Sequence, residues 1–335
     1  MKAAGYEFFD PLLSEEGARE LMRLAESFGS YGMYAQEPIR EGLGKGLFQR
    51  HDVALNFLAT GGRFGRRESI AALARRTNYF RETYAYADPV IDGIDGFLHY
   101  EPFYEAARRV SGRPVIKPAI VYANILVPGQ ELGLHTDVPE FRGLNRTKDP
   151  EWLMTVMLHS GLFEPWRIPI ATAVAWFGKH EGGEFCFYPE GPDGEASVLP
   201  ASHNTALLTD TDRCFHGVDR VGRDPGTEIP ALEIGMRLDF KGDGKWAVGG
   251  ADGPVANYGW EDLRFSISWK AYCYADDAER RTAEQHSDDL GPDEVVDRLA
   301  ADLRERGRLN GDVPGPTDLA LLMIEEYVKF PPPAA

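Results

Sequence analysis

Short apolar runs, separated by Gly, Pro and Asp, dominate the middle of the chain and are rich in Val, Ile, Phe, Tyr and Trp. This punctuation is typical of β-strands joined by tight turns. Because such short strands follow one another without intervening helices, they favour an antiparallel sandwich or barrel over a wound parallel sheet. The strands are predicted at residues 120–127, 133–136, 153–158, 172–177, 183–188, 205–209, 214–221, 232–240 and 265–274.

Both ends of the chain carry helical periodicity instead. Ser14 precedes Glu15 and Glu16, and a hydroxyl followed by carboxylates satisfies the free N–H groups and the positive dipole end of a helix. Apolar residues then recur at helical spacing until Gly29. Further helices are predicted near residues 68–74, 102–110, 295–303 and 319–328.

These patterns predict one structural domain, mainly β with flanking helices. Residues 1–113 form a helical and irregular region that packs on the core, residues 114–275 form the β-core, and residues 276–335 form a C-terminal helical extension. Within the core, the Gly-rich residues 221–262 are predicted to be an insertion, either a lid or an ordinary hairpin.

Composition narrows the class of protein. The chain has 335 residues, with 43% hydrophobic and 11% aromatic residues, which suffices for a buried core. Its 36 Lys and Arg against 53 Asp and Glu give a net charge of −17, which argues against nucleic acid and anionic membranes as partners.

The 3 cysteines include no C-x-x-C pair, so they are interpreted as reduced thiols rather than zinc ligands. The N-terminal residues lack the hydrophobic stretch of a signal peptide, and no segment reaches the roughly 18 apolar residues of a membrane span. These features predict a cytoplasmic protein.

The stretch Gly133-Leu134-His135-Thr136-Asp137 carries the first candidate chemistry. Residues two apart on a strand share a face, so His135 and Asp137 could bind one metal ion. His286-Ser287-Asp288 has the same spacing but lies in a charged tail, and we interpret it as solvated surface. A third candidate ligand is His216, near the other end of the β-region. Two histidines and one carboxylate leave coordination positions open, as in non-haem Fe(II) oxygenases.

Four motifs in order resemble those of the Fe(II)/2-oxoglutarate-dependent oxygenases, with the prolyl-hydroxylase-like branch as the nearest group. The N-terminal Phe8-Phe9-Asp10-Pro11-Leu12 is also similar to the start of that group. The resemblance implies a double-stranded β-helix, a jelly-roll, cupin-like core, with Fe(II) as cofactor and 2-oxoglutarate and O₂ as cosubstrates. The motifs are Pro128-Gly129-Gln130-x-Leu132-x-x-His135-x-Asp137, Gly182-Gly183-Glu184-Phe185-x-Phe187-Tyr188-Pro189, Phe215-His216-Gly217-Val218-x-x-Val221 and Arg264-Phe265-Ser266-Ile267-Ser268.

The resemblance implies roles for the matching residues. His135, Asp137 and His216 would hold iron, and Arg264 with Ser266 would bind the far carboxylate of 2-oxoglutarate. A guanidinium fork suits a carboxylate, and alternate residues on a strand share its face. Asn124 and Tyr122, on the strand before the metal motif, are candidates either to donate to the cosubstrate or to fill structural roles.

The spacing of the arginine departs from the family pattern. In the family the arginine follows the distal histidine closely, whereas 264 − 216 = 48 residues separate His216 and Arg264 here. Arg220 comes sooner but precedes a predicted turn. Arg237 lies in a strand-like run and stays a competitor, while the Ser266 partner favours Arg264.

Other residues near the motifs have two interpretations each. Glu131 and Glu140 flank the metal motif and could either attract a cationic amino-acid substrate or form a solvated rim. Three further histidines are interpreted as core or surface residues rather than ligands, and three tryptophans as core residues or pocket walls. These are His159, His180, His203, Trp152, Trp166 and Trp176.

The predicted function is that of a 2-oxoglutarate-dependent dioxygenase. The resemblance implies that 2-oxoglutarate is converted to succinate and CO₂ while an unactivated C–H bond is hydroxylated, desaturated or cyclised. The predicted substrate is a small polar metabolite, an amino acid or natural-product intermediate, with a prolyl or peptidyl residue as the second choice. The carboxylate of Asp137 disfavours a halogenase, because halogenases of the family lack that ligand.

Two alternatives come from other classes of protein. A cupin-like Zn or Mn hydrolase or isomerase would use similar ligands but would not need the anion site at Arg264. A metal-free binding module would require the three candidate ligands to diverge in space.

Overall fold

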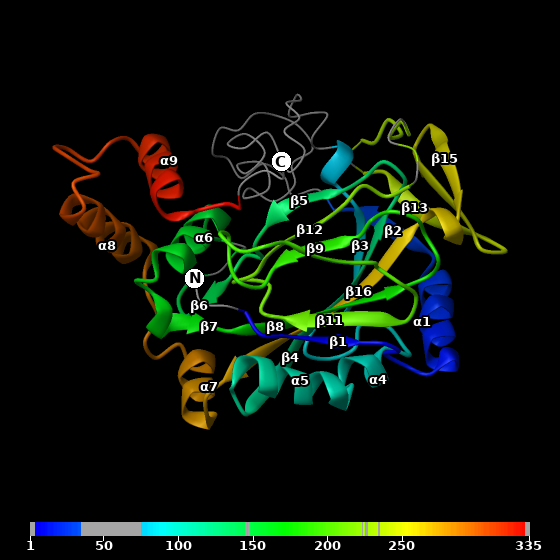
Figure 1. The fold of residues 1–335 in the computed structure, drawn as a ribbon, viewed down its shortest axis with the longest axis horizontal. Helices are drawn as coiled ribbons and strands as arrows, with labels where there is room; N and C mark the ends of the chain where they lie inside the picture. The colour runs from blue at the N-terminus through cyan, green and yellow to red at the C-terminus, as the bar shows by residue number, and fades with distance from the viewer. Residues whose placement is uncertain are drawn as a thin grey trace.

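Two facing β-sheets form the centre of the protein in the computed structural model (Figure 1). The structure describes residues 4–34, 75–144, 146, 148–222, 224, 227–233 and 235–331. The larger, 10-stranded sheet consists in spatial order of β1 (Tyr6–Phe9), β11 (Thr205–Thr209), β8 (Ile170–Phe177), β16 (Arg264–Tyr274), β4 (Val115–Leu126), β3 (Phe80–Ala85), β2 (Ser30–Met33), β13 (Arg237–Gly242), β14 (Lys245–Gly250) and β15 (Gly253–Gly259). The 4-stranded sheet consists of β10 (Ser197–Leu199), β9 (Phe185–Tyr188), β12 (Phe215–Val218) and β5 (Leu132–His135).

The chain alternates between these two sheets. From β4 it crosses to β5, returns to β8, crosses to β9 and β10, returns to β11, crosses to β12 and ends the core in β16. All the ladders are antiparallel. This wrapping of paired strands is a double-stranded β-helix, or jelly roll, and confirms the predicted fold class.

The two faces of β16 explain why the strand carries both apolar and polar residues. Phe265, Ile267 and Trp269 are fully buried in the largest hydrophobic cluster, on one face of the sheet. The alternate residues Ser266 and Lys270 point to the other face, where they line a cavity between the sheets. The large sheet therefore has one apolar face, which packs in the hydrophobic core, and one polar face, which lines the cavity.

Helices cover the outer face of the large sheet (Figure 1). These are α1 (Glu15–Phe28) at one end, and α4 (Asp95–Leu98) and α5 (Glu101–Ser111) beneath the central strands. The predicted start of α1 is confirmed, because Ser14 accepts a hydrogen bond from the Gly17 amide. Gly29 ends the helix in the left-handed conformation that glycine adopts without strain.

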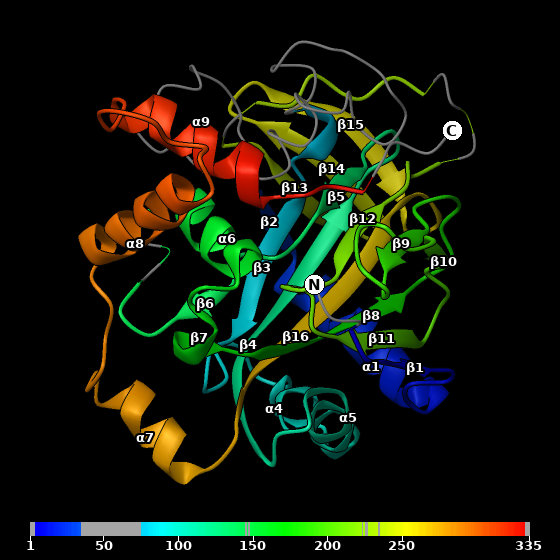
Figure 2. The same ribbon diagram turned by 60° about the vertical axis from the view of Figure 1, so that its left-hand side comes forward.

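A second group of helices packs beside the jelly roll around a separate hydrophobic cluster (Figure 2). It includes α6 (Glu151–Ser160), α8 (Pro292–Glu305) and α9 (Pro316–Tyr327), while α7 (Asp277–Glu284) follows β16 directly. A short ladder of β6 (Glu140–Phe141) and β7 (Arg167–Ile168) flanks this group, with the 3₁₀ turn η1 (Glu164–Trp166) before β7. Helices predicted near 102–110, 295–303 and 319–328 correspond to α5, α8 and α9.

The prediction of a strand at residues 153–158 is wrong, because these residues lie in α6. Every residue of that stretch is buried, so the helix shows no polar face. A short apolar run without periodicity does not distinguish a buried helix from a buried strand. The packing of α8 and α9 against this segment decides in favour of the helix.

Residues 221–262 extend the large sheet rather than crossing the site. The hairpin strands β13, β14 and β15 continue the sheet beyond β2, and η2 (Trp260–Asp262) leads back to β16. No described residue of this segment lines the central cavity. The predicted strand 232–240 begins only at Arg237.

Three further predictions concern a helix, the cysteines and membrane-spanning segments. The predicted helix at 68–74 lies outside the described residues. The 3 cysteines are free and buried, in agreement with their interpretation as reduced thiols. Among the helices of the described ranges, none combines the length and the apolar character that crossing a bilayer requires.

A buried histidine on α6 makes stability depend on pH. Burial lowers the pKa of His159 from 6.5 to about 4. Between these values the unfolded chain binds more protons at this residue, so its contribution to folding is present at pH 7 and is lost as the pH falls from 6.5 toward 4. We expect the melting temperature of His159→Gln to fall less between pH 7 and pH 5 than that of the wild type. The exposed His99→Gln is the control, and an equal pH dependence in both variants would contradict the assignment.

Candidate metal centre

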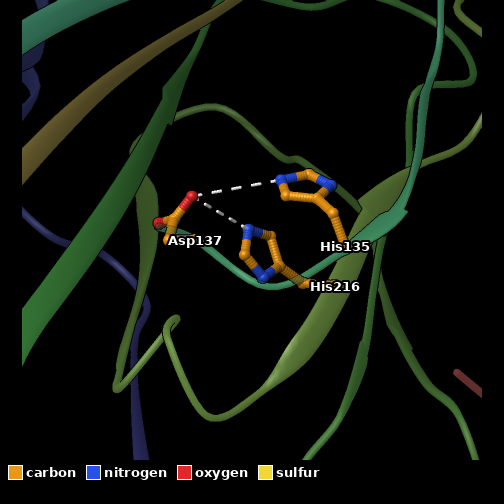
Figure 3. Close-up of side chains that lie close together, drawn as sticks. All are labelled: His135, Asp137 and His216. Atoms are coloured by element: carbon orange, nitrogen blue, oxygen red, sulfur yellow. Dashed lines mark ion pairs between the residues drawn. The ribbon is translucent and has the colours of Figure 1, made fainter. Parts of the chain in front are cut away.

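Three side chains from two neighbouring strands meet at one point (Figure 3). His135 and His216 stand directly opposite each other in the β5–β12 ladder, and Asp137 follows two residues after His135. Oδ1 of Asp137 lies 4.0 Å from Nε2 of His135 and 3.9 Å from Nε2 of His216. Ligand bonds of about 2.1 Å put opposite ligand atoms about 4.2 Å apart and adjacent ones about 3.0 Å apart, so one ion could bind all three side chains after they close by about 1 Å. All three side chains are buried.

Backbone carbonyls orient both imidazoles. Nδ1 of His135 lies 2.7 Å from the Gly133 carbonyl oxygen, and Nδ1 of His216 lies 2.9 Å from that of Cys214. A carbonyl only accepts, so each Nδ1 is the donor in these contacts. Each Nε2 then faces the Asp137 carboxylate, which is the arrangement that a histidine-bound metal requires.

The other oxygen of Asp137 is held by protein groups. Oδ2 accepts a hydrogen bond from Lys270 Nζ at 2.7 Å and from Thr211 Oγ1 at 2.5 Å. Thr211 Oγ1 also lies 2.8 Å from Thr172 Oγ1. Because Thr211 has one hydroxyl proton, Thr172 is the donor in that contact. Oδ1 is thereby turned toward the two histidines.

Sequence reasoning missed Lys270 and Thr211. The signal for Lys270 was its place on the same strand face as Arg264 and Ser266, four residues after the serine. Thr211 carried no comparable signal, because it reaches Asp137 only through the turn between β11 and β12. In that turn the Thr211 carbonyl accepts from the Asp137 amide at 2.9 Å.

A cavity of about 270 Å³ opens from the three candidate ligands. Arg264, at the start of β16, lines it with 2% of its surface exposed. Its Nε donates to the Gly183 carbonyl at 2.7 Å, while its buried Nη2 has no hydrogen-bond partner among the residues that the structure describes. Burial lowers the pKa of Arg264 to about 9, and the charge of Glu184 opposes that shift. A protonated guanidinium with a donor left over fits a bound carboxylate.

Gly183 gives a physical reason for the Gly-Gly motif. Its φ is +69°, and a Cβ there would lie 2.6 Å from Cδ of Arg264. Glycine therefore provides both the left-handed backbone conformation and the space that the arginine side chain occupies. The motif shapes the pocket around Arg264 without contributing a side chain of its own.

The structure places the other predicted cosubstrate residues on the cavity wall. Ser266, Asn124 and Tyr122 all line it. Nδ2 of Asn124 lies 3.4 Å from Ser268 Oγ, and its Oδ1 is buried without a hydrogen-bond partner. The competitor Arg237 instead lies exposed on β13, where it binds Glu82 at 2.9 Å, and it does not line the cavity.

The two carboxylates that flank the metal motif in the sequence, Glu131 and Glu140, have different surroundings in the structure. Glu140 lines the cavity and accepts a hydrogen bond from Tyr272 at 3.0 Å. Glu131 is buried in an ion pair with Arg76 and does not line the cavity, so the predictions of a substrate contact or a solvated rim are wrong for it.

The remaining candidates lie away from the cavity. None of the three tryptophans singled out from the sequence lines it, and neither does His159, His180 or His203. Trp176 is fully buried in the core. In the second His-x-Asp pair both residues are exposed, as expected of a surface pair, and Asp288 binds Arg142 at 2.7 Å.

Comparison with known proteins gives structural matches only. No family model and no curated protein matches the chain. A prolyl-4-hydroxylase from Pseudomonas putida is 11% identical with a TM-score of 0.39, over 81% of this chain and 93% of that chain. A prolyl hydroxylase from Trichoplax adhaerens is 9% identical with a TM-score of 0.42, over 83% and 87%. HygX from Streptomyces hygroscopicus, with nickel, 2-oxoglutarate and hygromycin B bound, is 10% identical with a TM-score of 0.38, over 81% and 84%. The first two of these proteins are named as prolyl hydroxylases, and the third is described with 2-oxoglutarate bound.

Replacing Thr211 tests whether its hydrogen bond prepares Asp137 for a metal. Thr211→Val removes one donor to Oδ2 without changing charge, and groups that orient a metal ligand typically contribute 10–100-fold in affinity. We expect an affinity for Co(II) at least about 10-fold lower, measured by titration of the metal-free protein. Thr205→Val, which removes a hydroxyl bonded to the Ser202 carbonyl, is the matched control. Equal Co(II) affinity in the two variants would show that Thr211 does not position the ligand.

A methyl group at Gly183 tests the space under Arg264. Gly183→Ala adds both left-handed strain and a contact with the arginine, whereas Gly161→Ala adds the strain alone, because Gly161 has φ +72° and open space. The strain costs about 1–2 kcal/mol in each variant. We expect urea unfolding to show a clearly larger loss of free energy for Gly183→Ala. An equal loss of unfolding free energy in the two variants would show that the contact between a methyl group at position 183 and Arg264 does not affect stability.

Proposed function

We propose that this protein is an Fe(II)/2-oxoglutarate-dependent dioxygenase that oxidises an unactivated C–H bond of a small polar metabolite. The observation that carries the proposal is the sharing of one cavity by two features. These are the cluster of His135, Asp137 and His216, and the buried guanidinium of Arg264 with a free donor.

In this proposal the three clustered side chains hold the iron. Two neutral imidazoles and one carboxylate oxygen form one face of an octahedron and leave three positions for exogenous ligands. Asp137 contributes Oδ1 only, because Lys270 and Thr211 engage Oδ2. A ligand that bound through both oxygens would occupy a further position, so these two contacts favour an open coordination sphere.

Arg264, Ser266 and Asn124 are proposed to bind the cosubstrate. The fork of Arg264 pairs with the carboxylate remote from the metal, and Ser266 shares its strand face. Asn124 stands opposite Ser266 across the β4–β16 ladder, which supports a polar contact along the same molecule.

Bound iron, 2-oxoglutarate and O₂ supply the oxidation, which yields succinate, CO₂ and the oxidised substrate. The chain orients these groups and limits access of water to them. The candidate ligands and Arg264 are all less than one-tenth exposed. Low polarity around them strengthens each charge interaction at the site.

The alternatives from other classes explain less of the geometry. A hydrolase or isomerase with Zn or Mn has no need of a buried guanidinium beside the metal ligands. A metal-free binding module would require the three ligands to diverge, whereas their ligand atoms lie within 4.8 Å of one another.

The central test is anaerobic addition of Fe(II) and 2-oxoglutarate to the metal-free protein. We expect a weak visible charge-transfer band, followed on admission of O₂ by production of succinate across a panel of small metabolites. Arg264→Met should weaken 2-oxoglutarate binding at least about 10-fold, because it removes a charged hydrogen bond of about 1.5–3 kcal/mol.

Arg237→Met is the matched control, since it removes an arginine that lies outside the cavity. It should retain the affinity for 2-oxoglutarate. A band that survives Arg264→Met and disappears in Arg237→Met would overturn the cosubstrate assignment. Absence of any band in the wild type, together with Zn- or Mn-dependent hydrolysis, would favour the metallohydrolase.

A further inference from the structure

A second guanidinium lines the same cavity and has no role in the proposed chemistry. Arg81, on β3, stacks over the ring of Tyr122 with Cζ 3.6 Å from the ring centroid, and it lies 4.7 Å from the centroid of Tyr34. These aromatic contacts stabilise a cation that is largely removed from water. A further contact is a hydrogen bond between Arg81 and the Tyr79 side chain, and the guanidinium keeps N–H donors beyond that one for a bound molecule.

Two other cations on the cavity wall are paired with carboxylates of the wall, and Glu151 is a further carboxylate there. Lys270 binds Asp137 at 2.7 Å, and Arg146 lies 4.0 Å from Glu140. Neither Arg264 nor Arg81 forms an ion pair with any residue that the structure describes. An arginine is charged at every physiological pH, and an unpaired charge in a partly closed cavity costs free energy. Two unpaired guanidiniums therefore favour two anionic groups on the molecules that bind here.

One cosubstrate leaves one of these guanidiniums without a partner. In the proposed function, one end of 2-oxoglutarate is neutralised at the metal and the other at Arg264. The remaining cation is Arg81. An additional anionic group in the cavity must then come from the primary substrate.

The sheet register separates the two arginines. Arg264 stands opposite Leu126 on one side of β4, while Arg81 stands opposite Asn124 on the other side. The guanidinium of Arg81 lies over the ring of Tyr122, on the far side of Asn124 from Leu126 along β4. Arg264 is held instead toward the Gly183 carbonyl. This divergence favours two distinct anion positions over one carboxylate gripped by both.

We propose that Arg81 binds a carboxylate of the primary substrate, so that the substrate class is a small organic acid, including an amino acid with a free carboxylate. This inference rests on the proposed function, which supplies the other anion. Tyr122 and Tyr34 hold the guanidinium in place. Arg81 is thus a specificity-determining residue rather than part of the cosubstrate site.

The first experiment asks which molecule Arg81 serves. Protein loaded with Ni(II), which prevents turnover, is titrated with 2-oxoglutarate by calorimetry. We expect Arg81→Met to bind 2-oxoglutarate within about 3-fold of the wild type, and Arg264→Met to bind it at least about 10-fold more weakly. A loss in Arg81→Met equal to that in Arg264→Met would overturn the proposal, because both arginines would then serve the cosubstrate.

The second experiment uses protein already saturated with Ni(II) and 2-oxoglutarate. The probes are the proteinogenic L-amino acids and a set of small monocarboxylic acids, each paired with its carboxamide. We expect at least one carboxylate to bind, its carboxamide to bind at least about 10-fold more weakly, and Arg81→Met to lose the difference. Arg146→Met, which removes another cationic side chain from the same cavity, is the matched control and should retain it.

Contrary outcomes of the second experiment are equally clear. Carboxylate binding that persists in Arg81→Met, or the absence of carboxylate binding in the wild type, rejects a substrate carboxylate at Arg81. Arg81→Lys keeps the charge and should retain part of the preference even where Arg81→Met folds poorly. Either rejection leaves the proposed function standing, since that function fails only when the wild type shows neither the charge-transfer band nor conversion of 2-oxoglutarate to succinate.

Discussion

The pairing register between β5 and β12 is the constraint on which the site depends. It sets His135 directly opposite His216, and a slip of one residue would turn one imidazole to the far side of the sheet. Asp137 follows two residues after the end of β5. The hydrogen bond from its amide N–H to the Thr211 carbonyl connects it to the turn before β12. The candidate metal centre is therefore a consequence of backbone hydrogen bonding, and the side chains add orientation to positions that the ladder has already chosen.

Charge inside the jelly roll is the second organising feature. The inner face of the large sheet carries Lys270, Arg264 and Arg81, although buried cations are costly unless they are compensated. Lys270 is compensated within the protein by Asp137. The two arginines rely on a backbone carbonyl and on aromatic rings, which satisfy part of their bonding capacity and leave part of it directed at the cavity. Lys270 therefore orients the Asp137 carboxylate, whereas Arg264 and Arg81 keep donors that suit bound anions.

Much of the fold was predictable, and the errors have identifiable causes. Strands with turn punctuation on both sides, such as β8 and β11, and a helix with caps at both ends, α1, matched the structure closely. The α6 segment was misassigned because complete burial erased its periodicity. The strands β1, β2 and β3 were missed, since they are short and gain their strand character only by pairing with β11, β13 and β4. Glu131 was taken for a rim residue because its buried partner, Arg76, lies far from it in sequence.

The sequence alone supplied the candidate ligands, two candidate anion-binding arginines and the antiparallel β-core, from residue type, from spacing within single strands and from the resemblance of four motifs to a known family. Only the tertiary structure decided the rest. It brought His216 to the His-x-Asp motif, separated Arg264 from Arg237 by burial, and placed Lys270, Thr211 and Arg81 around the cavity. The physical reason is that alternation along a strand is local, whereas the neighbour across a ladder, the closure of two sheets and the burial of a charge depend on segments far apart in the chain.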